Sequence, residues 1–144
     1  MKTKTPVWYL AGPMFKASPQ EKISWRVKIT ELFHFIRHET IIPPEDPFDG
    51  SSGKSLWAEA EALITGDMEN IRRSTGVIAW FPEHLPGIGT KMEIFYAKRI
   101  LNLPVFAWDG AWCGSPWFHG HIDMNFSSYP DVFEYIRVHQ DALI

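Results

Sequence analysis

A glutamate just after a glycine-bearing turn is the first residue of this sequence that could do chemistry. Glu93 closes the segment GIGTKME, in which Gly87 and Gly89 predict a turn that opens a helix. At a helix N-terminus the helix dipole and the free backbone N–H groups favour an anion, so an ionised Glu93 would be a plausible nucleophile. Thr90 and Glu93 also have the Thr-x-x-Glu spacing of a capping box, which requires no function. The spacing alone leaves both interpretations open.

Asp67 is the second acid that stands out, because it falls on the apolar side of a predicted helix. Leu63 and Ile71 lie four residues to either side of it, so all three share one helix face. A carboxylate on the face toward the core is unfavourable unless it is paired or used in chemistry. Alternatively, Thr65 and Gly66 mark a helix break, and Asp67 caps a new first turn. The sequence does not decide between a functional acid and a local cap.

Aromatic residues are the third group of candidates, since 15% of the chain is Phe, Trp or Tyr and seven residues are Trp. Rings outside the core suit a planar ligand or a subunit interface. Tyr9 falls inside an apolar run, and a tyrosine in a buried strand usually packs in the core with its hydroxyl bonded locally. Trp8, Trp57, Trp80 and Phe48 are likewise interpreted as packing residues.

The elements that must position these residues are predicted from apolar runs and turn signals. The segment SPQE has a capping-box pattern with proline at the first helical position, and Ile23, Val27 and Phe33 follow at helical spacing. Strands alternating with helices predict an α/β protein with a parallel sheet covered on both faces, which binds ligands beyond the carboxyl ends of its strands. The predicted strands are residues 7–11, 41–43, 77–81, 104–108 and 124–126, the helices residues 18–36, 56–73, 90–101 and 130–143, and the long loops residues 44–54 and 109–123.

Length and composition limit the class of protein. A chain of 144 residues is predicted to form a single domain, residues 1–144. Its formal net charge of −3 and scattered Lys and Arg residues give no basic stripe, so polymeric nucleic acid is not an expected partner. The one cysteine, Cys113, excludes an intrachain disulfide and favours a reducing cytoplasm, and no signal or membrane-spanning stretch is expected. His119 and His121 lack a third ligand at a recognisable spacing, so no metal is expected.

Four segments, taken together in order and spacing, resemble the nucleoside 2-deoxyribosyltransferase family across residues 7–108: YLAGPMF, GDMENI, VIA and GTKMEIFYA. The last of them, followed by a Leu-Pro-Val strand, is the most specific. The resemblance implies a flavodoxin-like, three-layer α/β/α fold with a mostly parallel sheet of four to five strands. It also implies an enzyme that moves a 2-deoxyribosyl group from one nucleobase to another through a covalent intermediate, with no metal or organic cofactor.

The resemblance also implies a role for each candidate residue. Glu93 would be the nucleophile, Asp67 the acid that assists the departing base, and Tyr9 the residue that hydrogen-bonds and orients the nucleophile. The chemistry would then be that of a retaining glycosidase, with a second base reclaiming the sugar from the glycosyl-enzyme. An aromatic ring at Phe15 would lie against the base. The expected substrate-binding residues are Gly12, Phe15, Asp46, Gly87, Gly89 and Asn125.

The sequence departs from the family pattern where the base and a phosphate would be recognised. Gly87 stands where the transferases usually carry an aspartate that contacts the base. Pro13 and Phe15 stand where relatives that hydrolyse deoxynucleoside 5'-monophosphates carry a serine and an arginine for the phosphate. A nucleoside and a free base are therefore the expected partners. A deoxynucleoside or deoxynucleotide N-glycosidase, and a non-catalytic nucleotide-binding module, remain the alternatives.

The resemblance also implies an assembly, because the family borrows an asparagine from a neighbouring subunit to hold the 5' end of the sugar. Asn125 is the residue of this sequence that matches it, which implies at least a homodimer. The Trp-rich stretch of residues 108–118 is interpreted as an interface in preference to a lid, since a lid would not need Trp108, Trp112 and Trp117 together.

Overall fold

Strands and helices alternate along the whole described chain, which in this computed structural model comprises residues 4–44 and 53–143. Asp46 and Phe48 lie outside the described residues. In chain order the elements are β1 (Val7–Ala11), α1 (Pro19–Phe35), β2 (Glu39–Ile41), α2 (Leu56–Arg72), β3 (Gly76–Trp80), α3 (Ile88–Phe95), the π-helical turn η1 (Tyr96–Ile100), β4 (Val105–Trp108), α4 (Pro116–His119), β5 (Met124–Phe126) and α5 (Tyr129–Leu143).

The five strands form one sheet in the order β2-β1-β3-β4-β5, and every neighbouring pair is parallel. This is the strand order of flavodoxin-like doubly wound folds, in which ligands bind beyond the carboxyl ends of the strands where the order reverses. Here that point lies between β1 and β3. The predicted fold class, a flavodoxin-like three-layer protein with a parallel sheet, is confirmed.

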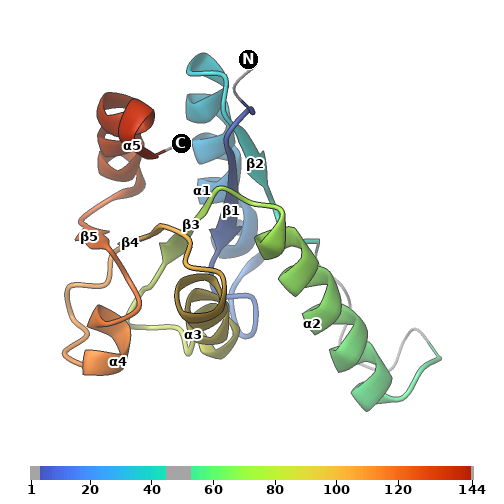
Figure 1. Cartoon of the computed structure of the whole chain (residues 1–144). Coiled ribbons are helices and arrows are strands. Elements are labelled where there is room, and N and C mark those ends of the chain that lie inside the picture. The colour runs from blue at the N-terminus through green and yellow to red at the C-terminus, as the bar shows by residue number, and fades with distance from the viewer. Residues whose placement is uncertain (1–3, 45–52, 144) are drawn as a thin grey trace.

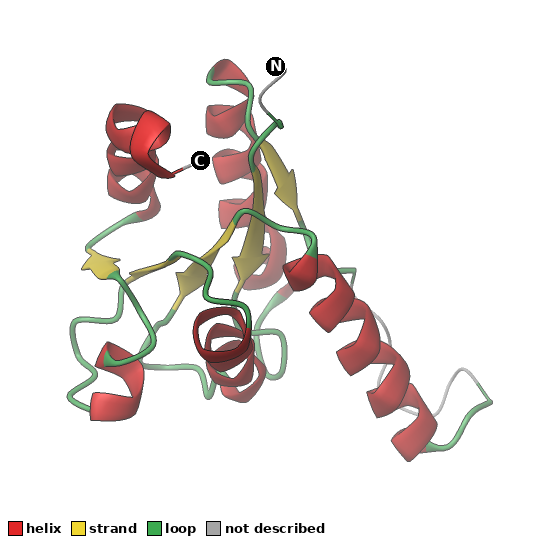
Figure 2. Cartoon of the chain, in the orientation of Figure 1, coloured by secondary structure: helices red, strands yellow, loops and turns green. Residues whose placement is uncertain are grey.

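Helices cover both faces of the sheet, as Figures 1 and 2 show. Alternate strand residues point to opposite faces, so Trp8 and Leu10 of β1 pack under α1 and α5, while Tyr9 and Ala11 pack under the opposite layer. That opposite layer consists of α2, α3 and η1, with Phe118 of α4 beside them. Tyr9 therefore shares a face of the sheet with the helices that carry Asp67 and Glu93.

Helix α1 begins as predicted but buries only part of its predicted apolar stripe. Ser18 caps it, Glu21 completes the capping box, and Pro19 occupies the first turn. The buried residues are Trp25, Arg26, Ile29 and Phe33, whereas Ile23 and Val27 of the predicted apolar stripe are 45% and 42% exposed. The aliphatic stem of an arginine can pack on an apolar face. Arg26 therefore lies on the buried face of α1, although its hydropathy predicts an exposed position.

Two other elements differ from the prediction. Strand β2 spans Glu39–Ile41 instead of residues 41–43, because the polar residues Glu39 and Thr40 pair with Val7 and Trp8 at the edge of the sheet. The loop predicted at residues 109–123 contains the short helix α4, which Ser115 caps. In the described ranges 4–44 and 53–143, no helix is both long and apolar enough to cross a membrane.

The close packing of Trp8 and Pro104 around Gly76 can be tested by substitution. A Cβ added at Gly76 would lie 2.5 Å from Cζ3 of Trp8 and 2.9 Å from the Pro104 carbonyl oxygen, whereas one at Gly66 in α2 meets nothing within 4 Å. We expect Gly76→Ala to lower the free energy of unfolding by about 1–3 kcal/mol. Gly66→Ala should raise it by roughly 0.5–1 kcal/mol, because alanine favours the helix. Urea unfolding measures both, and a stable Gly76→Ala protein would contradict the packing.

Candidate active site

A hydrogen bond between two residues 84 positions apart in sequence lies at the centre of the candidate site. Tyr9 comes from β1 and is fully buried, and Glu93 comes from α3 on the same face of the sheet. The Tyr9 hydroxyl donates to Oε2 of Glu93. The structure therefore brings together two of the three predicted catalytic residues in direct contact.

The turn before α3 sets the position of Glu93, and it differs from both sequence interpretations. Gly87 caps the helix in the left-handed conformation, with φ at 59°, and α3 begins at Ile88. Glu93 therefore lies in the second turn and not at the helix terminus. The predicted capping box is wrong, because Thr90 is already inside the helix and its buried Oγ1 has no hydrogen-bond partner among the described residues. Glycine at this position tolerates the positive φ that the sharp entry requires.

The expectation that Glu93 stays ionised through the helix dipole is also corrected. Burial raises the pKa of the Glu93 carboxyl to about 8 from its ordinary 4.5. The hydrogen bond from Tyr9 and the charge of Arg26 lower this pKa, while the charge of Asp67 raises it. Loss of hydration is the largest of these effects, as is usual for a carboxyl group in apolar surroundings. Glu93 is thus a carboxyl group that can change protonation state near neutral pH.

The phenol of Tyr9, unlike the Glu93 carboxyl, stays protonated at every ordinary pH. Its pKa is raised far above the usual range, first by burial and then by the negative charges of Glu93 and Asp67. A neutral phenol can only donate its proton in the hydrogen bond to a carboxylate. Tyr9 therefore acts as a fixed hydrogen-bond donor toward Glu93, and the sequence interpretation of Tyr9 as a core residue is also correct, since it packs against Ile71 and Ile94.

Asp67 completes the group from α2. Of the two alternatives that the sequence leaves open for Asp67, the helix break at Thr65 and Gly66 is wrong, because α2 runs without interruption through Leu56–Arg72. Asp67 is partly buried, one turn before the fully buried Ile71. Its charge acts on both Glu93 and Tyr9. Like-charge interaction of this kind separates the protonation behaviour of two carboxyl groups, which is a common feature of acid–base pairs in active sites.

A fourth charged residue, Arg26 of α1, is not among the site residues that the sequence predicts. Its side chain is completely buried, and its charge interacts with Glu93, Tyr9 and Asp67. Burial lowers its pKa to about 10, so the guanidinium remains positive at neutral pH. A signal was available, because Arg26 lies three residues before Ile29 and seven before Phe33, on the face that α1 buries.

The predicted substrate-binding residues lie in several different environments. Gly12 follows β1 and lies against Trp25, since a Cβ there would be 2.6 Å from the Trp25 ring. Gly89 opens α3 and a Cβ there would meet nothing within 4 Å, so this position faces open space. Phe15 is 71% exposed, in the turn after β1. Pro13 and Gly87 line one small surface crevice, which places the turn after β1 beside the turn before α3.

Asn125 does not join this group within one chain. It lies on β5, and its Oδ1 accepts a hydrogen bond from the backbone N–H of Gly110 at 3.0 Å. Strands β4 and β3 separate β5 from β1 in the sheet.

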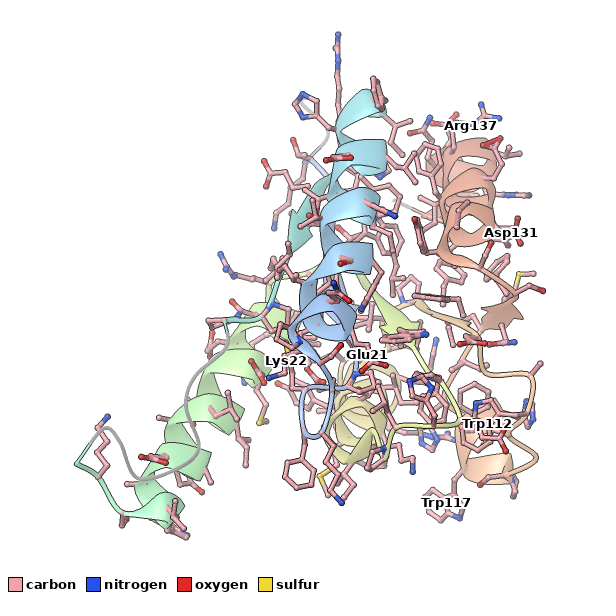
Figure 3. All side chains as sticks on the ribbon, turned by 180° about the vertical axis from the view of Figure 1, so that it is seen from behind. Glu21, Lys22, Trp112, Trp117, Asp131 and Arg137 are labelled. Atoms are coloured by element: carbon pink, nitrogen blue, oxygen red, sulfur yellow. The ribbon has the colours of Figure 1, made fainter. Side chains whose placement is uncertain are left out.

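The Trp-rich region divides into two environments. Trp108 packs under α1 and α5, stacked on Trp80 with ring centroids 5.3 Å apart, so it is not part of a shared surface with the other two. Trp112 stacks on Phe81 and donates to its carbonyl oxygen at 2.7 Å. Trp117 is 74% exposed and projects from the outer side of α4 in Figure 3. A mainly apolar cavity of about 600 Å³ lies between α3 and this segment.

The histidines of this region have other partners. His119 lies 2.8 Å from the Cys113 carbonyl oxygen through Nε2, and His121 bonds through Nδ1 to the Trp117 carbonyl oxygen. Over residues 4–44 and 53–143, no three His, Cys, Asp or Glu side chains converge in a way that could hold a metal ion.

Comparison with known proteins shows the fold. No protein-family model and no curated protein sequence matches the chain. A solved structure of a 2-deoxyribosyltransferase from the psychrotolerant bacterium Bacillus psychrosaccharolyticus is similar to it, with a TM-score of 0.67 and 18% sequence identity. The similarity covers 88% of this chain and 90% of that one. The two proteins therefore share their architecture over nearly their full lengths.

The raised pKa of Glu93 predicts a pH dependence of stability that does not involve activity. Folding favours the protonated carboxyl, so its stabilising effect is complete below about pH 4.5 and is lost as the pH rises toward about 8. Glu93→Gln does not titrate at this position. We expect thermal unfolding to show an advantage of Glu93→Gln over the native protein that grows between these two pH values. Glu61→Gln, on an exposed part of α2, is the control, and a pH-independent difference for Glu93→Gln would contradict the assignment.

Proposed function

We propose that this protein is an enzyme that transfers a 2-deoxyribosyl group between nucleobases, with Glu93 as the nucleophile. The observation that carries the proposal is the contact between Tyr9 and Glu93, with the charge of Asp67 acting on both, at the end of the sheet where this fold binds ligands. The similar architecture of a 2-deoxyribosyltransferase supports the same activity. Membership of the nucleoside 2-deoxyribosyltransferase family is part of this proposal.

The reaction would proceed in two displacements at C1' of the sugar. In the first, a carboxylate oxygen of Glu93 bonds to C1' as the C1'–N bond breaks, and the base leaves with the bonding electrons and takes a proton from Asp67. In the second, a nitrogen of another base attacks C1', its proton passes to Asp67, and the ester bond to Glu93 breaks. A carboxylate facing the cationic, oxocarbenium-like transition state stabilises it electrostatically.

Tyr9 would hold Glu93 in the orientation that this attack needs. Its hydroxyl occupies Oε2 of Glu93, which leaves the other carboxylate oxygen for C1'. A neutral donor also favours the ionised carboxylate without cancelling its charge. Tyr9 and Arg26 therefore favour the ionised form that must attack C1', against the larger effect of burial, which raises the pKa of Glu93 to about 8.

The proposed substrate is a 2'-deoxynucleoside, with a free base as acceptor and no cofactor. Exposed Phe15 would lie against the base, and the open space at Gly89 would admit it close to the first turn of α3. Gly12, Gly87 and Asp46 remain predicted substrate contacts. Because Gly87 brings no carboxylate, the enzyme would recognise the base with fewer side-chain hydrogen bonds than the transferases that carry aspartate there.

A homo-oligomer and a cytoplasmic location also remain predictions. We expect Asn125 to reach the sugar from another subunit, since β3 and β4 lie between β5, which carries Asn125, and β1, which carries Tyr9. The exposed side chains of Met92, Phe95 and Trp117 around the cavity between α3 and α4 give an apolar surface suited to contact with a second copy.

Substitution of the nucleophile tests the proposal directly. Glu93→Gln should lower deoxyribosyl transfer at least about a thousandfold, because the amide cannot form the ester to C1'. Incorporation of a labelled free base into a deoxynucleoside measures transfer. Mass spectrometry of the acid-quenched native enzyme should find one deoxyribosyl group on the peptide that contains Glu93. Free deoxyribose as the sole product, with or without added base, would show a hydrolase instead, and unchanged turnover in Glu93→Gln would reject the nucleophile.

Asp67 can be tested through the leaving group. Asp67→Asn should slow transfer from a neutral purine deoxynucleoside by about 10²–10⁴-fold, the usual range for loss of a general acid. N7-methylated 2'-deoxyguanosine releases its base without a proton, so its cleavage should change far less. Steady-state rates of both substrates give the comparison. Equal losses for the two substrates would mean that Asp67 does not supply the proton.

A further inference from the structure

Arg26 is a buried charged residue to which the proposed reaction assigns no step. Arginine is almost never fully buried unless its charge is compensated. Its Nε donates to the Leu10 carbonyl oxygen at 3.0 Å and one terminal nitrogen donates to the Gly12 carbonyl oxygen at 3.2 Å. The other terminal nitrogen donates to the Lys22 carbonyl oxygen and lies 3.8 Å from the sulfur of Met14. These acceptors are neutral, so they satisfy the donors without cancelling the charge.

The bonds of Arg26 fix the end of the strand that carries Tyr9. Leu10 follows Tyr9 directly, and Gly12 is the first residue after β1. Figure 3 labels Lys22, one turn before Arg26 in α1. From this part of α1 the guanidinium of Arg26 reaches the carbonyl oxygens of Leu10 and Gly12. The fit leaves no spare room, because a Cβ at Gly12 would lie 3.1 Å from the guanidinium nitrogen. Arg26 thus approaches from the α1 side of the sheet, while the side chain of Tyr9 points to the α3 side.

The positive charge of Arg26 acts on the charged and titratable groups that meet at this end of the sheet. These groups are Glu93 of α3, Tyr9 of β1 and Asp67 of α2. The charge opposes the effect of burial on Glu93 and favours its ionised form. An interaction through the poorly solvated end of β1 is weakened less than it would be in water.

We propose that Arg26 is a positioning residue, which fixes the strand end that carries Tyr9 and supplies the positive charge that favours ionised Glu93. The inference rests on the proposed function in assigning a catalytic use to that ionisation. A direct ion pair would occupy the carboxylate oxygen that must reach C1'. Because the guanidinium is bound to backbone carbonyl groups instead, it favours the anion and leaves that oxygen accessible.

Removing the charge should shift the pH dependence of activity. In Arg26→Met and Arg26→Gln, we expect the acidic limb of the kcat/KM profile for deoxyribosyl transfer to move about one pH unit upward, since an opposite charge has been lost near Glu93. On that limb the rate should fall about tenfold and recover at higher pH. Arg26→Lys keeps the charge but loses the fork that binds two carbonyl groups, so kcat should fall while the limb stays in place.

The control is Lys28→Met, which removes an exposed charge two residues further along α1 and should leave the profile unchanged. An equal loss of rate at all pH values in Arg26→Met would show a structural role alone and overturn the proposal. The same limb shift in Arg26→Lys would show that the charge is not responsible. If the uncharged variants do not fold, Arg26→Lys still tests the proposal, because a shifted limb in this variant overturns it.

A measurement without turnover separates this inference from the proposed function. The carboxyl carbon of Glu93 can be titrated by NMR in protein labelled with ¹³C-glutamate, and Glu93→Gln identifies its signal. We expect its midpoint to rise by about one pH unit in Arg26→Gln and to stay near the native value in Arg26→Lys. An unchanged midpoint would overturn the role of Arg26. If the Arg26 variants show the expected titration shifts but the native protein has no deoxyribosyl transfer activity, the proposed function is refuted and the role of Arg26 stands.

Discussion

The need to keep one carboxyl group both buried and able to ionise is the constraint on which the site depends. Burial raises the pKa of Glu93 to about 8, and only a hydrogen bond and a positive charge oppose it. Tyr9 supplies the hydrogen bond from the strand, and Arg26 supplies the charge from beyond it. Both groups depend on the position of β1, because Tyr9 lies on this strand and Arg26 donates to the carbonyl oxygens of Leu10 and Gly12 at its end.

The parallel sheet makes this arrangement possible because consecutive residues of one strand serve opposite faces. Tyr9 turns its hydroxyl toward α3, while the next carbonyl group, that of Leu10, accepts from Arg26 of α1. Helix α2 adds Asp67, whose charge acts on Glu93 and Tyr9. Four different elements, β1, α1, α2 and α3, thus each contribute one titratable or charged group.

The periodicity of the chain predicts most of the fold, and it fails where tertiary contacts override local pattern. Ser18 caps α1 as the sequence predicts, and Ser115, which also precedes a proline, caps the short helix α4 inside the segment predicted as a loop. The Thr-x-x-Glu pattern suggested a helix start at Thr90, but the left-handed conformation of Gly87 starts it earlier. Arg26 was missed because hydropathy treats every arginine as exposed, although its donors can be satisfied by strand-end carbonyl groups.

The position of Glu93 in the second turn of α3 also changes how its reactivity must be understood. At a helix terminus, backbone N–H groups would hold the carboxylate ionised independently of nearby side chains. In the second turn those groups are used by the helix itself, so ionisation depends on Tyr9, Arg26 and Asp67. An ion held so weakly is a better nucleophile than one held by many donors, because less interaction is lost when its charge disappears in the ester. The same burial that opposes the anion therefore favours its reaction.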